Sequence, residues 1–271
     1  MSLLTTPFDH LLLEDLGRGV VKVTLDRPEK LNALHDGLWS ELDHLCGVVP
    51  TDASVRALVL TGAGRGFCAG ADLEVINGLP DASVRDFLAV QEKGARVIAA
   101  VKRIPVPVVA AVNGPAAGGG LALALAADVR IAVPTARFNV AFVRLGLSGC
   151  DVGVSWLLPR VVGLGHASEL MLTGRLIDAE EGYRIGLVNS LVKPDDLLAA
   201  ARDLAFEMVR NSPLGLQLTK EALQLSIDAP SMEAAIALEN RNQLIASRSE
   251  DAPIAMRAFA EKIPAPDFTG R

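Results

Sequence analysis

The chain has 271 residues, half of them hydrophobic, and a formal net charge of −6. This length can bury a large core in one extended domain or in one domain with an appendage. The negative charge and the lack of a block of Lys and Arg argue against a nucleic-acid partner. No stretch is long and apolar enough for a membrane span, and residues 1–9 lack the pattern of a secretory signal. We therefore expect a cytoplasmic protein with no membrane partner.

Cysteine and histidine usage excludes several kinds of site. Cys46, Cys68 and Cys150 are odd in number and lack metal-ligand spacing, which favours a reducing compartment and predicts no metal site. Cys68 lies beside a glycine-rich loop, and we interpret it as a small buried residue rather than a reactive thiol. The four histidines lack a Ser or Cys partner in a nucleophile motif, so we expect no hydrolytic triad.

The first two thirds of the chain alternate between strand and helix patterns. The predicted strands are 20–25, 57–60, 106–112, 129–133 and 187–192. The predicted helices are 34–48, 83–102, 119–127, 166–173 and 178–185. This order predicts an α/β fold.

The last part of the chain is mainly helical. Ser, Asp or Pro lies near the start of each of four segments with helical spacing. The predicted helices are 195–211, 213–227, 231–246 and 251–262. We place a boundary near Lys193-Pro194, which gives a core of residues 1–194 and a helical region of residues 195–271.

Two glycine-rich loops carry the first chemical signal. The first is Phe67-Cys68-Ala69-Gly70-Ala71-Asp72, and the second runs from Asn113 to Gly120. Each follows an apolar run and predicts a strand leading into a helix, whose first N–H groups are free and favour negative charge. Two such donors aimed at one point form an oxyanion hole. The alternative is that the glycines only permit tight turns and close packing.

Five segments, in this order, resemble the crotonase, or enoyl-CoA hydratase/isomerase, superfamily. They are LDRPEKLNAL at 25–34, GFCAGADL at 66–73, PVVAAVNG at 107–114, LTGR at 172–175 and IGLVN at 185–189. The resemblance implies a spiral of ββα turns followed by a helical trimerisation region, and assembly as a homotrimer or a hexamer. It also implies acyl-CoA substrates, with coenzyme A as part of the substrate and no separate cofactor.

The resemblance also assigns roles to residues. The oxyanion-hole donors fall on the backbone N–H groups of Ala71 and Gly119. The backbone of 69–73 would line the adenine pocket, with Arg27 and Lys30 near the pantetheine and phosphates. The tail near 259–262 would approach a neighbouring subunit's CoA site. The predicted substrate contacts are Arg27, Lys30, Ala69, Ala71, Asp72, Leu73, Gly118, Gly119 and Phe142. A solvated surface role is the alternative for Arg27 and Lys30, and a helix N-cap is compatible with the role of Asp72.

Two departures from the family pattern bear on the mechanism. Family hydratases usually carry a glutamate three residues after the oxyanion-hole glycine, where this chain has Ala122. A second glutamate is expected about four residues after the position of Phe138, where this chain has Phe142. Because neither side chain can move a proton, the two-glutamate hydration route is not available.

Asp151 is the candidate catalytic carboxylate. Its segment, GCDVGVSWLLPR at 149–160, resembles family members that shift double bonds and also the aromatic dehalogenases. A dehalogenase would want a histidine base within 83–102, and none is present there. An isomerase can use one base twice, which Asp151 alone can do. The alternative is that Asp151 only caps a helix that starts near Val152.

Other carboxylates and other functions stay open. Glu74 and Glu92 are weaker candidates for a base, and Asp128 is expected to satisfy buried backbone groups. The sequence favours an acyl-CoA isomerase that uses Asp151. The alternatives are a hydratase or other lyase that uses another carboxylate, and a non-catalytic acyl-CoA-binding homologue.

Overall fold

A parallel sheet forms the centre of the protein. The structure, a computed structural model, describes residues 2–264 and 267–270. The main sheet has the order β1-β2-β3-β4-β6-β9, and only β1 is antiparallel to its neighbour. Its strands are β1 Leu11–Asp15, β2 Val20–Leu25, β3 Ala57–Gly62, β4 Val108–Val112, β6 Val129–Ala132 and β9 Ser190–Leu191. Strands β3 and β4 are buried along their whole length, as their continuous apolar runs predict for a sheet covered on both faces.

A small second sheet lies beside the main one. Its order is β5-β7-β8, with β5 parallel to β7 and β7 antiparallel to β8. The strands are β5 Ala116–Ala117, β7 Arg137–Asn139 and β8 Ile177–Asp178. This sheet connects the second glycine-rich loop to the segments that follow α4.

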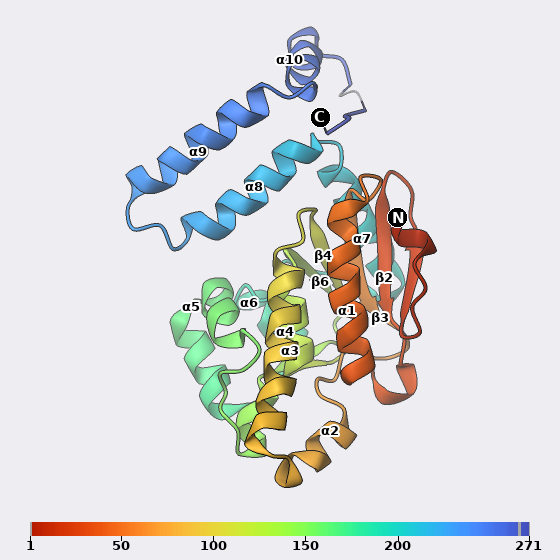
Figure 1. Ribbon diagram of the computed structural model, residues 1–271, viewed down its shortest axis with the longest axis vertical. Coiled ribbons are helices and arrows are strands. Elements are labelled where there is room, and N and C mark those ends of the chain that lie inside the picture. The colour runs from red at the N-terminus through yellow and green to blue at the C-terminus, as the bar shows by residue number, and fades with distance from the viewer. Residues whose placement is uncertain (1, 265–266, 271) are drawn as a thin grey trace.

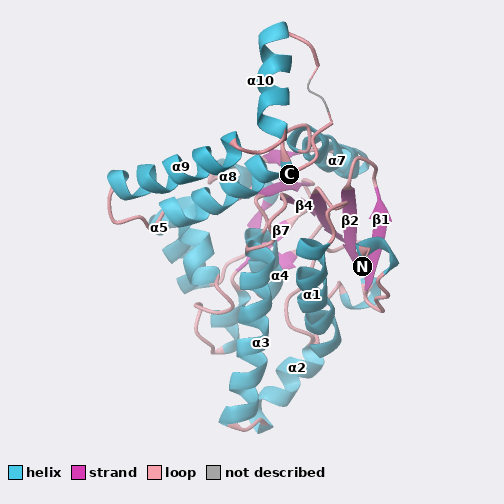
Figure 2. Ribbon diagram, turned by 45° about the horizontal axis from the view of Figure 1, so that its top comes forward, coloured by secondary structure: helices cyan, strands magenta, loops and turns pink. Residues whose placement is uncertain are grey.

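Ten α-helices are described in residues 2–264 and 267–270, and Figures 1 and 2 show their arrangement. They are α1 Asp36–Val48, α2 Leu73–Gly78, α3 Val84–Lys102, α4 Gly119–Ala126, α5 Val154–Thr173, α6 Ala179–Arg184, α7 Leu197–Met208, α8 Pro213–Ser226, α9 Met232–Ser247 and α10 Asp251–Glu261. Helix α7 packs against β2, β3, β4 and β6, while Figure 1 shows α1, α3 and α4 in front of the sheet. None of these helices is long and apolar enough to cross a membrane.

The α/β prediction is confirmed, and so are most of the predicted elements. Helix α3 starts where its cap predicts, because Ser83 Oγ accepts a hydrogen bond from the N–H of Asp86. The helix predicted at 166–173 is only the second half of α5, which Gly163 interrupts with a φ of 77°. The sequence missed β1, whose Leu-Leu-Leu start does not alternate. It predicted a helix after the first glycine-rich loop without giving its end, and the structure has the six-residue helix α2 there, with Asp72 as its N-cap.

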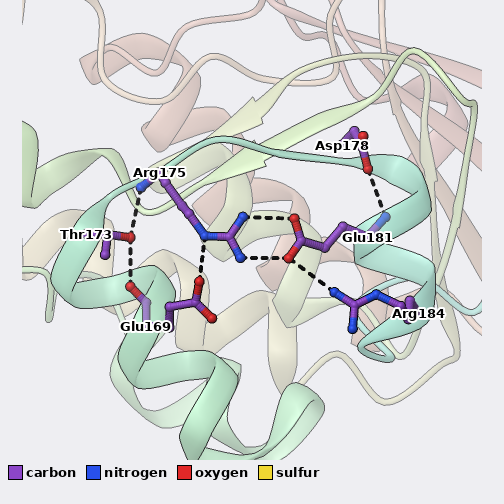
Figure 3. Close-up of polar contacts among 6 residues, drawn as sticks. All are labelled: Glu169, Thr173, Arg175, Asp178, Glu181 and Arg184. Atoms are coloured by element: carbon purple, nitrogen blue, oxygen red, sulfur yellow. Dashed lines mark hydrogen bonds and ion pairs between the residues drawn. The ribbon is translucent and has the colours of Figure 1, made fainter.

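An ion-pair cluster around Arg175 connects the end of α5 to α6 (Figure 3). The guanidinium of Arg175 donates to Glu181 at 2.8 and 2.6 Å, and its Nε donates to Glu169 at 2.7 Å. The hydrogen bonds from Arg175 hold the pKa of Glu181 below its usual value. Beside the end of α5, a Cβ on Gly149 would lie 2.6 Å from the carbonyl oxygen of Met171. The second half of α5 therefore lies directly behind the loop that carries Asp151.

The C-terminal helices have two different environments. Helix α7 buries Leu197 and Ala201 against the core, whereas Figure 1 shows α8, α9 and α10 extending away from it. Lys220 of α8 anchors this extension, since its Nζ lies 2.7 Å from Asp128 Oδ2 and donates to the carbonyl of Val106 at 2.9 Å. Asp128 also accepts from the backbone N–H of Val108, as expected, but its ion pair with Lys220 was not foreseen. The boundary near residue 194 stays a prediction.

Candidate active site

The two glycine-rich loops pack directly against each other. Cys68 N–H donates to the carbonyl of Pro115 at 3.0 Å, and Ala117 N–H donates back to the carbonyl of Cys68 at 3.0 Å. A Cβ on Gly120 would lie 2.0 Å from the Cys68 oxygen, and a Cβ on Gly70 would lie 2.6 Å from the Ala117 oxygen. Gly70 also has a φ of 91°. Only glycine permits this close approach, so turn formation and anion binding depend on the same residues.

The backbone N–H of Ala71 points away from the neighbouring segment, which contains Leu34. Leu34 N–H donates to the Gly70 oxygen at 2.7 Å, and Asp72 N–H donates to the Leu34 oxygen at 2.9 Å. In a parallel bridge of this kind, the residue between the two bonded partners directs its own N–H to the opposite side. Within the described residues, no acceptor takes the N–H of Ala71.

Gly119 supplies a second free donor. It is buried and is the first residue of α4, so its N–H has no partner inside the helix. No acceptor within residues 2–264 and 267–270 takes this N–H either. Both Ala71 and Gly119 line one pocket. The two residues that the family resemblance assigned to an oxyanion hole thus line a common cavity, and their role as donors to a ligand stays a prediction.

The pocket is largely apolar and has a volume of about 140 Å³. Trp39 of α1 and Phe142 of the 3-10 helix η5 (Ala141–Leu145) form parts of its wall. Val75 of α2 and Phe87 of α3 contribute from the segment after the first loop. An apolar cavity with a few convergent polar groups is typical of a small-molecule site, and here it suits an acyl chain beside a polarised carbonyl.

Asp151 lines the same pocket. Its Oδ1 accepts a hydrogen bond from the backbone N–H of Val152 at 2.8 Å. The N-cap residue of α5 is Gly153, and no side chain caps that helix, so Asp151 does not serve as its N-cap. No cation pairs with this carboxylate within the described residues. It is therefore available to accept a proton from a bound ligand.

Other ionisable groups of the pocket were not singled out from the sequence. Asp36 and Lys93 form an ion pair at 2.5 Å, and Lys93 also donates to Ser40 at 2.7 Å. His35 Nδ1 accepts from the N–H of Leu38 at 3.3 Å, and burial is the main cause that lowers the pKa of this imidazole. The pocket lining has two carboxylates, Asp36 and Asp151. Lys93 pairs with Asp36, whereas Asp151 has no cationic partner among the described residues.

The positions of the family glutamates hold no acid or base. Ala122 is fully buried in the core, and the ring of Phe142 lines the pocket. The two weaker candidates for a base, Glu74 and Glu92, do not line the pocket. Glu74 is exposed, with its carboxylate 3.7 Å from Lys30 Nζ, and Glu92 is exposed on α3.

Two residues predicted to contact CoA, Arg27 and Asp72, form an ion pair with each other. Arg27 Nη2 lies 2.9 Å from Asp72 Oδ2, and its Nη1 donates to the carbonyl of Ala33 at 2.5 Å. Asp72 also caps α2 by accepting from the N–H of Glu74 at 3.1 Å, so its N-cap role is present. Arg27 therefore has a structural role, and its contact with a phosphate stays a prediction.

The remaining predicted substrate contacts lie along the same loops. Ala69 N–H donates to the carbonyl of Leu31 at 3.0 Å, and the side chain of Leu73 is exposed. Gly118 has a φ of 50°, and a Cβ there would lie 3.3 Å from the ring of Phe142. None of these three lines the acyl pocket, and their contacts with a ligand also stay predictions.

Two asparagines that the sequence analysis did not single out hold the loops in place. Asn32 is fully buried and its Nδ2 donates to the carbonyls of Ala63 and Gly66 at 2.9 and 2.8 Å. Asn113 Nδ2 donates to Gly66 as well, at 3.1 Å. Burial raises the pKa of the Cys68 thiol to about 12, which agrees with its interpretation as a packing residue.

Comparison with known proteins identifies this arrangement. The family model described as enoyl-CoA hydratase/isomerase matches residues 15–271. The chain belongs to this family. It is 42% identical to a probable enoyl-CoA hydratase of Mycobacterium bovis over 86% of this chain and 84% of the relative. It is 38% identical to the 1,2-epoxyphenylacetyl-CoA isomerase of Escherichia coli over 97% of this chain and 99% of the relative.

A solved structure supports the fold along the chain. The crystal structure of an enoyl-CoA hydratase from Bacillus anthracis matches with a TM-score of 0.92 at 31% identity, covering 97% of this chain and 100% of that one. The protein thus has the crotonase fold with a C-terminal helical region, as the sequence predicted. Family membership makes it an enoyl-CoA hydratase/isomerase family enzyme that acts on acyl-CoA.

Proposed function

We propose that the protein is an acyl-CoA double-bond isomerase in which Asp151 is the single acid/base. The observation that carries this proposal is the pocket itself: its lining has two backbone N–H groups and one carboxylate that have no acceptor or cationic partner in the part of the chain that the structure describes, while the family glutamate positions hold Ala122 and Phe142. Hydration needs one group to activate water and another to protonate the α-carbon. A double-bond shift needs only one group, used twice.

The proposed reaction converts a 3-enoyl thioester into its 2-enoyl isomer. Asp151 takes a proton from C2, and the electron pair of that C–H bond moves into a dienolate whose charge rests on the thioester oxygen. The N–H groups of Ala71 and Gly119 stabilise this oxygen. The dienolate then takes the same proton from Asp151 at C4, the double bond comes to lie between C2 and C3, and the carboxylate is regenerated.

The chain has similar relatives named as hydratases and as an isomerase, so the names of relatives alone do not decide between these two activities. The E. coli relative named as an isomerase matches over 97% of this chain, which supports the proposal. The M. bovis relative carries a hydratase name at slightly higher identity, which keeps the hydratase as the second candidate. The two candidates differ in whether water is activated, and this can be measured directly.

The test compares two reactions on purified protein. With 3-hexenoyl-CoA, we expect the conjugated 2-enoyl thioester to form, whereas hydration of 2-hexenoyl-CoA should be poor. Asp151→Asn keeps size and most hydrogen bonding but cannot accept the proton, so the isomerase kcat should fall by about 10²-fold or more. Hydratase turnover that exceeds isomerase turnover, together with a fully active Asp151→Asn variant, would overturn the proposal.

A further inference from the structure

Val152, directly after the proposed base, has an unusual backbone. Its φ is 37°, in the left-handed region, although it is β-branched. Side chains branched at Cβ are the least suited to this region, because the branch crowds the neighbouring carbonyl. Gly153, the next residue, also has a positive φ of 83° and bears no such strain. Strain of this kind persists only where the surrounding structure enforces it.

Val152 packs beside Gly94, in a space that it shares with Trp39. The residue is buried, and a Cβ on Gly94 of α3 would lie 3.2 Å from its Cγ1. The same Cβ would lie 3.4 Å from Cζ2 of Trp39 on α1, so Gly94 leaves room for both side chains. Glycine in the middle of a 19-residue helix is unfavourable in itself. Its presence at 94 is explained by the space that Val152 and Trp39 fill.

The strained residue is hydrogen-bonded to the carboxylate of Asp151. The backbone N–H of Val152 donates to Asp151 Oδ1 at 2.8 Å. The carbonyl of Asp151 accepts from the N–H of Val154 at 2.9 Å, which fixes the turn on the other side. The direction of the carboxylate therefore depends on the orientation of the peptide between Asp151 and Val152, and this peptide turns if Val152 relaxes to a negative φ.

We propose that Val152 is a positioning residue: its left-handed backbone, held by packing in the space beside Gly94 that it shares with Trp39, directs the carboxylate of Asp151 into the acyl pocket. This inference rests on the proposed role of Asp151 as the base. Misplacing a reacting group by about 1 Å can cost about 10²-fold in rate, so a local backbone change here has a large effect without any change in the chemical groups.

The test uses three substitutions at one position. Val152→Ala removes both methyl groups, including the Cγ1 that lies beside Gly94, but keeps the Cβ that disfavours a left-handed backbone, so the turn should relax. Val152→Gly removes more volume, yet glycine accepts the left-handed conformation freely. Val152→Asn tolerates it better than most residues. The alanine variant should therefore lose at least about tenfold in kcat, with a nearly unchanged KM. The glycine and asparagine variants should retain a kcat at least about fivefold above that of the alanine variant.

A role in packing alone gives the opposite order. If Val152 only fills space, the glycine variant, which leaves the larger cavity, should be worse than the alanine variant in both thermal stability and kcat. That order, or a kcat for Val152→Ala equal to that of the unsubstituted protein, overturns the inference. Thermal unfolding of each variant shows whether it is folded, and the comparison is confined to the folded variants.

A double substitution shows whether the effect acts through Asp151. If it does, Val152→Ala should cause no further loss in the Asp151→Asn background. A further tenfold loss in that background contradicts positioning. An inactive Asp151→Asn with a fully active Val152→Ala overturns the positioning role but leaves the proposed base intact. A fully active Asp151→Asn overturns both.

Discussion

At the scale of single residues, the site depends on backbone groups as much as on side chains. Ala71 and Gly119 each present an N–H without an acceptor among the described residues. The protein fixes these donors by packing two loops together through Gly70 and Gly120, so they need no reorganisation when charge develops on a substrate oxygen. The N–H at 119 can be removed by proline, which is well tolerated at the first position of a helix.

We therefore predict that Gly119→Pro is a catalytic rather than a folding defect. Alanine is the matched control, because it keeps the N–H while adding a Cβ that would lie 2.8 Å from Leu34 Cδ1, the far end of a side chain rather than backbone. The kcat for isomerisation should be about 10²- to 10³-fold lower in Gly119→Pro than in Gly119→Ala. Steady-state kinetics measure the difference, and thermal unfolding compares stability. Equal turnover in the two folded variants would remove this donor from the mechanism.

Local sequence could predict the two glycine-rich loops but not the rest of the pocket. A glycine-bordered helix start has a local signature, so both loops are visible in the chain itself, whereas the family resemblance was needed to assign the donors to Ala71 and Gly119. Trp39 and Lys93 have no such signature, because each lies on an ordinary helical face. They line the pocket only because α3 crosses α1 near Gly94. The left-handed backbone of Val152 is equally invisible, since valine ordinarily argues against it.

At the scale of elements, a buried ion pair fixes the start of α2. Asp72 caps this helix and pairs with Arg27, which belongs to the segment after β2. The pKa of Asp72 lies below its usual value, first because of the backbone N–H of Glu74 and then because of Arg27. A carboxyl with a lowered pKa stabilises the fold above its unfolded pKa, and this contribution is lost as the pH falls through the folded value.

Asp72→Asn tests this connection, because asparagine can still cap α2 but cannot pair with Arg27. At pH 7 we expect the free energy of unfolding to fall by about 1.5–3 kcal/mol, the range for hydrogen bonds to charged groups. The difference from the unsubstituted protein should begin to shrink as the pH falls below about 4, the pKa of the unfolded carboxyl, and should be lost as the pH falls through the lower pKa of the folded carboxyl.

Denaturant unfolding across pH measures this effect. Asp36→Asn is a suitable control, because its carboxylate is 86% exposed and its pair with Lys93 should contribute about 1 kcal/mol or less. A difference for Asp72→Asn that is the same at pH 3 and pH 7 would show that the lost charge is not its cause.

Elements with strong internal periodicity were predictable, and elements that depend on neighbours were not. Helices α3 and α8 were predicted nearly to their ends, because caps and prolines mark them. The short strands β5 and β8 exist only because β7 lies between them, and neither has a pattern of its own. The ion pair of Lys220 with Asp128 likewise joins residues 92 positions apart, beyond any local pattern.

At the scale of the whole molecule, the C-terminal helices expose many large apolar side chains for their length. A groove between α8 and α9 is lined by residues that include Leu218, Leu223 and Ala246. Other large apolar side chains are exposed on the same extension, among them Met232, Leu244, Met256 and Phe259. Large exposed apolar side chains gathered on one extension are typical of an interface, and the family resemblance predicts a trimer.

We predict that the protein assembles through these helices as a homotrimer or a dimer of trimers. Light scattering at micromolar concentration should give three or six times the 28.5 kDa chain mass. Leu244→Asp introduces a charge on α9 at a side chain that is 65% exposed, and it should lower the assembled mass because a buried unpaired charge opposes association. Leu12→Asp on β1, at a side chain that is 53% exposed, is the control and should leave the mass unchanged. A monomer for the unsubstituted protein at that concentration would contradict the assembly, and equal masses for the two variants would place the interface elsewhere.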